Sequence, residues 1–192
     1  MCSLEGSAAL VTGASRRAGI GQAIVRTLAR QGADVFITYF RPYDRETGLA
    51  EPADDPQALI DELREMGRRA AGLELDLADP HAPRKLFEQV DATLGSVNIL
   101  VNNATYSMRD GIEALSASLL DRHYAVNVRG MALLCVEFVK RYREAPRPIG
   151  YGRIINLSSG QSVEPMPGEL AYVATKGAVE AFTVSLSAEV AE

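Results

Sequence analysis

Short apolar runs alternate with longer helical patterns along most of this chain, and this alternation restricts the fold more than any other feature. A strand followed by a helix, repeated five times, requires a parallel sheet covered by helices on both faces. Right-handed crossovers make a doubly wound α/β sheet the expected fold. The apolar runs lie at 8–13, 33–40, 70–77, 97–104 and 152–159, and the helical patterns lie at 19–32, 56–67, 82–95, 119–143 and from 168 onward.

Length and charge narrow the function classes. The chain has 192 residues, of which 47% are hydrophobic, and we predict one domain over residues 1–192. It carries 20 Lys and Arg against 25 Asp and Glu, a net charge of −5. An acidic chain without a basic tract makes nucleic acid or an anionic membrane an unfavourable main partner.

Several absences in the sequence point to a cytoplasmic protein without a metal. No apolar run approaches the roughly 18 residues of a membrane-spanning helix, and the first residues lack the basic-then-apolar pattern of a signal peptide. Cys2 and Cys135 form no recognisable disulfide framework. His81 and His123 stand alone, so we expect no histidine-based metal site or catalytic triad.

A glycine-rich turn follows the first predicted strand. Ligands of doubly wound sheets bind outside the carboxyl ends of the strands, and the segment TGASRRAGIG (12–21) lies at such an end. Glycine lets the backbone turn tightly and approach a pyrophosphate closely, and the N-terminus of the following helix attracts a phosphate group. A plain surface turn is the alternative, but a position between the first strand and first helix favours a nucleotide site.

The segment GELAYVATKGAVEAF (168–182) carries a tyrosine and a lysine within mostly small or apolar residues. Tyr172 and Lys176 are four residues apart, so they share one face of the predicted helix. A free tyrosine titrates near pH 10 and is a poor base. A positive charge about 4 Å away supplies roughly 4 kcal/mol toward its anion at an effective dielectric constant near 20. A core tyrosine beside a snorkelling lysine is the alternative.

Taken together, these motifs resemble the short-chain dehydrogenase/reductase family from about residue 5 to the end of the chain. The turn resembles T-G-x-x-x-G-x-G, with two residues added between Gly13 and Gly19. LVNNAT (100–105) resembles the N-N-A-G motif, with Thr105 in place of glycine. Within the family, the chain is most similar to the 3-oxoacyl-(acyl-carrier-protein) reductase-like group.

The resemblance assigns the catalytic and cofactor-binding residues. It implies a Rossmann-type NAD(P)-binding fold in which Tyr172 exchanges a proton with a carbonyl or hydroxyl oxygen. Lys176 would assist Tyr172 and bind the nicotinamide ribose, and Ser159, thirteen residues before Tyr172, would hydrogen-bond the reacting oxygen, with Ser158 as the nearest competitor. Asn127 would hold a water in a proton relay. The expected cofactor-binding residues are Gly13, Ser15, Arg16, Arg17, Gly19, Ile20, Gly21, Arg41, Asp76, Leu77, Asn103, Ala104, Tyr172 and Lys176.

The arginines favour NADP(H) over NAD(H). NAD enzymes of this kind often carry an acidic residue just past the second strand, but here TYFRPYD offers no acid before Asp44. Arg16, Arg17 and Arg41 are suited to a 2′-phosphate through charge-assisted hydrogen bonds. Simple solvation of one or two of these arginines is the alternative.

The substrate is less defined by the sequence. The segments 105–116 and 160–169 are expected to line its site, but neither offers a charged pair suited to a particular molecule. The Pro- and Asp-rich connection 41–56 is predicted to be a mobile surface loop near the adenosine end.

Members of the family continue past this point with two more strands and further helices, so the resemblance predicts a fold that lacks its usual last strands. Strand 152–159 would then be an uncovered edge. We expect an oxidoreductase that reduces a ketone, such as a 3-oxoacyl thioester, to a secondary alcohol or the reverse, and that forms a homo-oligomer. The alternatives are a dinucleotide-binding or assembly module with little turnover and, last, a nucleotide-sugar epimerase or dehydratase.

Overall fold

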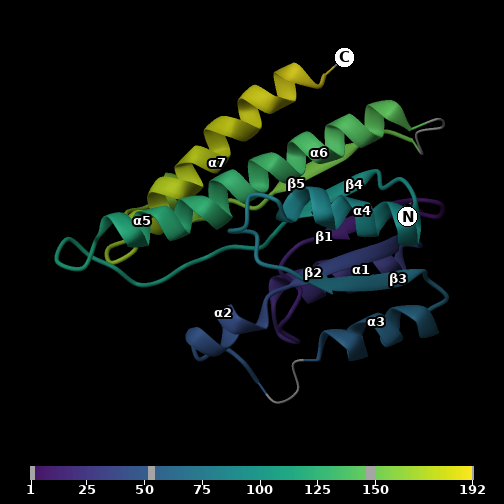
Figure 1. The fold of residues 1–192 in the computed structure, drawn as a ribbon, viewed down its shortest axis with the longest axis horizontal. Helices are drawn as coiled ribbons and strands as arrows, with labels where there is room; N and C mark the ends of the chain where they lie inside the picture. Colours follow the sequence, from purple (N-terminus) through teal and green to yellow (C-terminus); the bar gives the residue numbers. More distant parts are fainter. Residues whose placement is uncertain (1–2, 52–54, 146–149, 192) are drawn as a thin grey trace.

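Five parallel strands form one sheet, and Figure 1 shows helices on both of its faces. The computed structural model describes residues 3–51, 55–145 and 150–191. The strands lie in the order β3-β2-β1-β4-β5, and every neighbouring pair is parallel. This arrangement confirms the predicted doubly wound α/β fold. The strands are β1 (Ala8–Val11), β2 (Asp34–Tyr39), β3 (Ala70–Glu74), β4 (Ile99–Asn102) and β5 (Arg153–Asn156).

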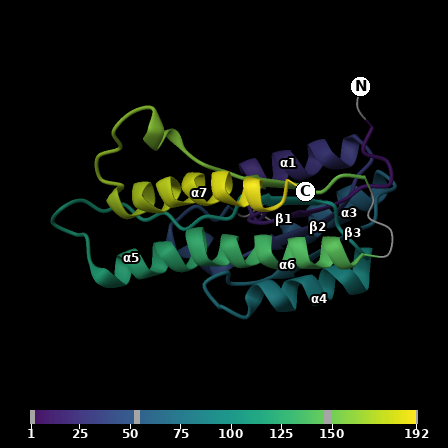
Figure 2. The same ribbon diagram turned by 90° about the horizontal axis from the view of Figure 1, so that it is seen from above.

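The central strands are apolar at almost every position because both of their faces are buried. In β1, Ala8 and Leu10 point into one core and Ala9 and Val11 point into the other, as the two-residue period of a strand requires. The first core lies under α4 (Ala82–Leu94), α6 (Met131–Glu144) and α7 (Leu170–Glu189), and Figure 2 shows α4 beside α6. The second lies under α1 (Ile20–Arg30) and α3 (Pro56–Glu65).

The predicted helix 119–143 is a continuous helical run with an irregular middle. It consists of α5 (Ala117–Tyr124), a π-helical turn (Ala125–Gly130) and α6. Such π-helical turns are frequent at functional sites, and this one contains Asn127. The turn packs against the segment that follows β3, because a Cβ atom on Gly130 would lie 2.8 Å from the carbonyl oxygen of Leu77.

The connection 41–56 differs from the predicted loop. Its first residues form α2 (Arg41–Glu46), and Asp44 within this short helix is only 6% exposed. The Tyr43 hydroxyl donates a hydrogen bond to the Ser107 carbonyl (3.0 Å) and accepts one from the Ser107 N–H (3.1 Å). Arg122 on α5 forms an ion pair with Glu46 (3.1 Å). These partners lie more than sixty positions further along the chain, so local composition gave no sign of them; residues 52–54 lie outside the described ranges.

The β5 strand lies at one edge of the sheet and is more open than the central strands. Its residues alternate between exposed and half-buried, and Ile155 is 49% exposed. The predicted open edge is therefore present at β5.

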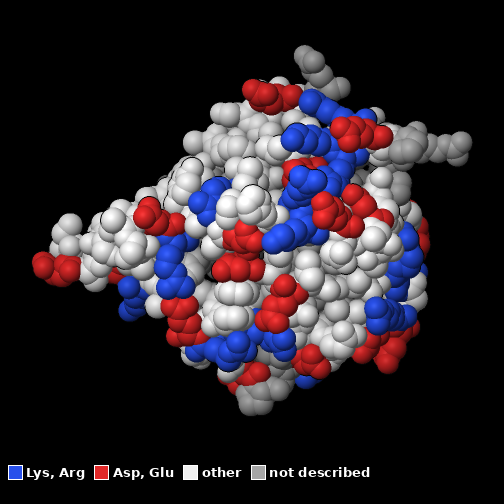
Figure 3. Space-filling view, in the orientation of Figure 1, with Lys and Arg blue, Asp and Glu red and all other residues white. Residues whose placement is uncertain are grey.

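Charges of both signs are distributed over the surface. Figure 3 shows Lys and Arg side chains intermixed with Asp and Glu side chains over one face of the molecule. Among the residues that the structure describes, no helix is long and apolar enough to cross a membrane.

Alanine substitution at two glycines is expected to change the free energy of unfolding in opposite directions. Alanine favours a helix over glycine by roughly 1 kcal/mol, and nothing lies within 4 Å of a Cβ atom on Gly177 in α7, so Gly177→Ala is expected to raise the free energy of unfolding. At Gly130 the new methyl group meets backbone, and overpacking costs about 1–3 kcal/mol, so Gly130→Ala is expected to lower it. Urea denaturation measures both changes, and a shift of the same sign in the two variants would contradict this packing.

Candidate active site

A cleft of about 660 Å³ lies at the carboxyl ends of the strands. Residues that follow each of the five strands line it, and α7 contributes Tyr172 and Lys176. Its size falls within the range of small-molecule and cofactor sites. Of the predicted site residues, the lining includes Gly13, Ser15, Arg16, Gly19, Ile20, Gly21, Asp76, Leu77, Asn103, Ala104, Tyr172 and Lys176, whereas Arg17, Arg41, Asn127 and Ser159 are not part of it.

The glycine-rich turn packs too tightly for side chains at two positions. Gly13 has φ +74°, and a Cβ atom there would lie 2.7 Å from the Cα atom of Ala104. A Cβ atom on Gly21 would lie 2.4 Å from the Gly13 carbonyl oxygen. These glycines bring the first turn of α1 against the end of β1.

The N-terminus of α1 suits a phosphate. Gly19 caps the helix without a side-chain hydrogen bond, and the first turn contains no acidic residue. The first N–H groups of a helix lack partners within the helix and, with the helix dipole, attract anions. The residues present therefore fit the pyrophosphate of a dinucleotide.

Two polar side chains join the ends of β1 and β4. The Thr12 hydroxyl accepts hydrogen bonds from the N–H groups of Asn103 (3.1 Å) and Ala104 (3.0 Å). The Asn103 amide donates to the carbonyls of Thr12 (2.8 Å) and Gly13 (2.9 Å). Thr12 is the threonine of the T-G-x-x-x-G-x-G pattern but was not predicted as a site residue, because the pattern names no partner for it on another strand.

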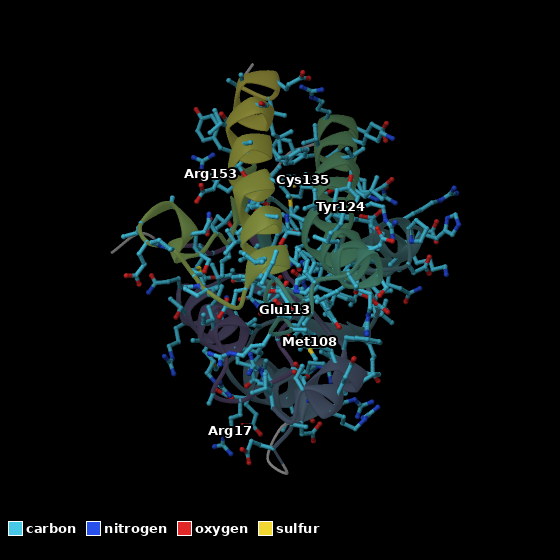
Figure 4. All side chains as sticks on the ribbon, turned by 90° about the vertical axis from the view of Figure 1, so that its left-hand side faces the viewer. Arg17, Met108, Glu113, Tyr124, Cys135 and Arg153 are labelled. Atoms are coloured by element: carbon cyan, nitrogen blue, oxygen red, sulfur yellow. The ribbon has the colours of Figure 1, made fainter. Side chains whose placement is uncertain are left out.

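The arginines predicted for the adenosine end have acidic neighbours. Arg16 lies on the cleft, and its Nε is 3.6 Å from the carboxylate of Asp44. Arg41 pairs with Glu74 at 2.5 Å, and this hydrogen bond lowers the pKa of the Glu74 carboxyl below its usual value. Arg17 is exposed, and Figure 4 shows it at the periphery of the molecule.

The Asn127 side chain is fully engaged by protein groups. Its oxygen accepts hydrogen bonds from the Thr105 hydroxyl (3.1 Å) and the Tyr106 N–H (2.7 Å). Its amide group donates to the Tyr106 carbonyl (2.9 Å) and to the Thr175 hydroxyl (3.0 Å). These four bonds use the whole capacity of an amide, so the side chain ties the segment after β4 to α7.

Tyr172 and Lys176 both reach the cleft, as their spacing predicts. Lys176 is 5% exposed, and its ammonium group donates a hydrogen bond to the Leu157 carbonyl (2.7 Å). The ammonium lies 5.5 Å from the centre of the Tyr172 ring. Burial lowers the pKa of Lys176 below its usual value, because water no longer solvates the charged form.

The two serines after β5 have different surroundings. Ser158 lines the cleft and donates a hydrogen bond to Glu180 on α7 (2.6 Å). Gln161 donates to the same carboxylate oxygen (2.8 Å). Ser159 is half-buried and precedes a short 3-10 turn (Gly160–Ser162). The structure thus brings Ser158 to the cleft with Tyr172 and does not bring Ser159 there.

The buried thiol of Cys135 is not part of the cleft lining. Cys135 lies in the core between the sheet and α6 (Figure 4), and burial raises the pKa of its thiol to about 12, so it is a poor nucleophile. Cys2 lies outside the described residues. Within the described ranges, no group of three His, Cys, Asp or Glu residues could hold a metal ion.

Comparison with known proteins identifies many relatives. A family model described as "short chain dehydrogenase" matches residues 7–192. An uncharacterized oxidoreductase of Bacillus subtilis, YjdA, is 45% identical over 95% of this chain and 68% of its own length. Versicolorin reductase stcU of Emericella nidulans is 32% identical over 96% of this chain and 63% of its own length. The chain thus spans about two thirds of the length of these relatives.

Solved structures have the same fold. A short chain dehydrogenase from Burkholderia cenocepacia in complex with NADP has a TM-score of 0.82 and 33% identity, covering 98% of this chain and 70% of that one. A blue fluorescent protein from a metagenomic library in complex with NADPH has a TM-score of 0.81, 34% identity and the same coverage. LugOII, described as a promiscuous reductase that catalyses keto-reduction at C1 during lugdunomycin biosynthesis, has a TM-score of 0.79 and 35% identity, covering 100% of this chain and 74% of that one.

The buried ammonium of Lys176 predicts a pH dependence of stability. Below its folded-state pKa, both folded and unfolded chains carry the proton, and the full cost of burying the charge is present. That cost falls as the pH rises through the folded-state pKa and is gone above the usual lysine value of 10.5. The melting temperature of the wild type, relative to that of Lys176→Met, is therefore expected to rise over the pH range just below 10.5. A difference that stays constant or falls in thermal melts across this window would contradict the burial.

Proposed function

Because this chain belongs to the short-chain dehydrogenase family, we propose that it is an NADP(H)-dependent oxidoreductase that reduces a ketone to a secondary alcohol, or catalyses the reverse reaction. The observation that carries the proposal is the placement of Tyr172 and Lys176 on one face of α7, open to the cleft that the glycine-rich turn also lines. The pyrophosphate-binding turn and the proton-transfer pair thus share one cavity.

The residues of the chain would handle the proton and hold the reacting groups. When bound, the nicotinamide supplies or accepts the hydride. Tyr172 donates a proton to the carbonyl oxygen during reduction and takes it back during oxidation. Lys176 carries a buried positive charge beside the ring, which favours the phenolate left after the proton is transferred. The N-terminus of α1 and the Gly13 turn would hold the pyrophosphate.

We retain Ser159 as the proposed hydrogen-bond donor to the reacting oxygen, on the strength of its spacing from Tyr172. Ser158 is the alternative, because it lines the cleft. Alanine substitution of each serine distinguishes them. The donor's removal is expected to reduce kcat by about a hundredfold, and a larger loss for Ser158→Ala would transfer the role to Ser158.

Reduction of a ketone is the favoured direction. Versicolorin reductase and LugOII are reductases by description, and LugOII acts on a keto group. The proposed substrates are therefore ketones, including 3-oxoacyl thioesters.

The cofactor is proposed to be NADP(H). Arg16 lies on the cleft, and two of the similar structures contain NADP or NADPH. Arg41 would have to leave Glu74 to reach a 2′-phosphate, so Arg16 is the primary candidate for that contact. A Michaelis constant for NADH below that for NADPH would contradict this preference.

A cofactor-binding module with little turnover is the second candidate. NADPH binding without ketone-dependent oxidation would identify it. Assembly into a homo-oligomer in the cytoplasm remains part of the proposal, and a monomer in light scattering would contradict that part.

The test of the enzyme is NADPH oxidation against a panel of 3-oxoacyl thioesters and cyclic ketones. Tyr172→Phe removes the proton donor and is expected to lower kcat by at least about a hundredfold. NADPH fluorescence should show that the variant still binds the cofactor. Equal turnover by the wild type and Tyr172→Phe would contradict the proposed role of Tyr172.

A further inference from the structure

Asp110, in the segment after β4, binds the start of α7. Its Oδ1 atom accepts a hydrogen bond from the Leu170 N–H (2.6 Å), and its Oδ2 atom accepts one from the Ala171 N–H (2.8 Å). The N–H of Asp110 donates to the Gly168 carbonyl (2.8 Å). The residue is 8% exposed, so its charge is satisfied by these backbone groups rather than by water.

The helix has no cap of its own. Glu169 occupies the N-cap position without a side-chain hydrogen bond, and the first turn contains no acidic residue. The first N–H groups of a helix need partners, and a carboxylate at this end is favoured by the helix dipole. Asp110, from another part of the chain, supplies both the hydrogen-bond acceptors and the negative charge. Ala171 immediately precedes Tyr172, so this carboxylate fixes the turn that carries the tyrosine.

The other end of the Asp110 segment is the cleft wall. The segment begins at Asn103, and side chains of other elements accept several of its N–H groups. Asn127 binds the N–H of Tyr106 (2.7 Å), and the Nε2 atom of His123 accepts the N–H of Met108 (3.2 Å). Because these bonds restrain the backbone between the cleft wall and residue 108, a displacement of Asp110 relative to α7 is expected to displace the cleft wall relative to Tyr172.

We propose that Asp110 is a positioning residue that keeps the Tyr172 turn in register with the cleft wall formed by residues 103–106. This inference rests on the proposed function for its kinetic consequence. The phosphate-binding turn at Gly13–Gly21 stays joined to the cleft wall through Thr12 and Asn103. Loss of Asp110 is therefore expected to move the start of α7 relative to that wall, and to change cofactor affinity much less than kcat. Misplacement of a reacting group by about 1 Å costs on the order of a hundredfold in rate.

A purely stabilising helix cap is the competing explanation, and a local cap separates the two. Aspartate at an N-cap accepts hydrogen bonds from the next N–H groups and stabilises a helix. Glu169→Asp would therefore give α7 a cap of its own without joining it to the cleft wall. Asp110→Asn combined with Glu169→Asp is expected to recover the melting temperature lost in Asp110→Asn but not the kcat.

The kinetic experiment compares these variants in the intact chain. Asp110→Asn is expected to lower kcat between about ten- and a hundredfold, with the NADPH dissociation constant changed less than twofold. Glu65→Gln is the matched control: it removes one exposed carboxylate on α3, outside the cleft lining, and should leave both values unchanged. If Asp110→Asn is insoluble, Asp110→Glu is the substitute variant. It keeps the carboxylate but moves both oxygens one methylene further from the backbone, so it should still lower kcat.

Hydrogen exchange gives a readout that does not depend on turnover. Asp110→Asn is expected to speed exchange in the peptides spanning 103–110 and 168–176 together, and Glu169→Asp should then protect only the second. If the wild type has no turnover, the proposed function fails while this comparison still decides the role of Asp110. An unchanged kcat, a kcat restored together with the melting temperature, or faster exchange confined to α7 would overturn the proposal.

Discussion

The hydrogen bonds between Thr12 and the segment after β4 hold the site together. Thr12 follows β1, and Asn103 follows β4. These hydrogen bonds hold the carboxyl ends of the neighbouring strands β1 and β4 side by side. Without them the two segments that follow the strands would separate as independent loops. The close contact of Gly21 with the Gly13 carbonyl then sets α1 against the same point. A side chain at either glycine would push α1 away from β1. The shape of the cleft therefore depends on the fact that neither residue has a Cβ atom.

The cleft gains its second wall from α7. This helix contacts the segment after β4 through Asp110 at its start. One turn later, its Thr175 hydroxyl accepts a hydrogen bond from Asn127, which in turn binds the N–H of Tyr106 in that segment. Lys176 binds the carbonyl of Leu157, beyond the end of β5. The helix that carries the proposed proton donor is therefore joined to two strand ends by polar contacts, most of them buried, and its position is set by tertiary contacts rather than by its own sequence.

The features that the sequence predicted are those with a local period or spacing. The strand and helix pattern, the Gly13–Gly21 turn and the shared face of Tyr172 and Lys176 each depend on residues less than about ten positions apart. Composition and periodicity carry that information directly. The open edge at β5 was expected from the family resemblance rather than from a local pattern.

The features that were missed join residues far apart in the sequence. The six residues of α2 were predicted to be part of a loop. Their composition did not show that Tyr43 and Glu46 bind Ser107 and Arg122, which lie far along the chain. Glu74 draws Arg41 away from the cleft, and Asp110 reaches α7 across 60 positions. A polar residue in a loop does not disclose its partner, so no pattern in the sequence identifies these contacts. The catalytic assignments from the family resemblance remain proposals.

The most direct test of the account is the structure of this chain bound to NADP⁺. The account predicts the pyrophosphate at the N-terminus of α1, the adenosine beside Arg16 and Asp76, and the nicotinamide next to the Tyr172 hydroxyl. A dinucleotide bound outside this cleft, or bound in it with the nicotinamide turned away from Tyr172, would contradict the central claim that the strand ends and α7 form one oxidoreductase site.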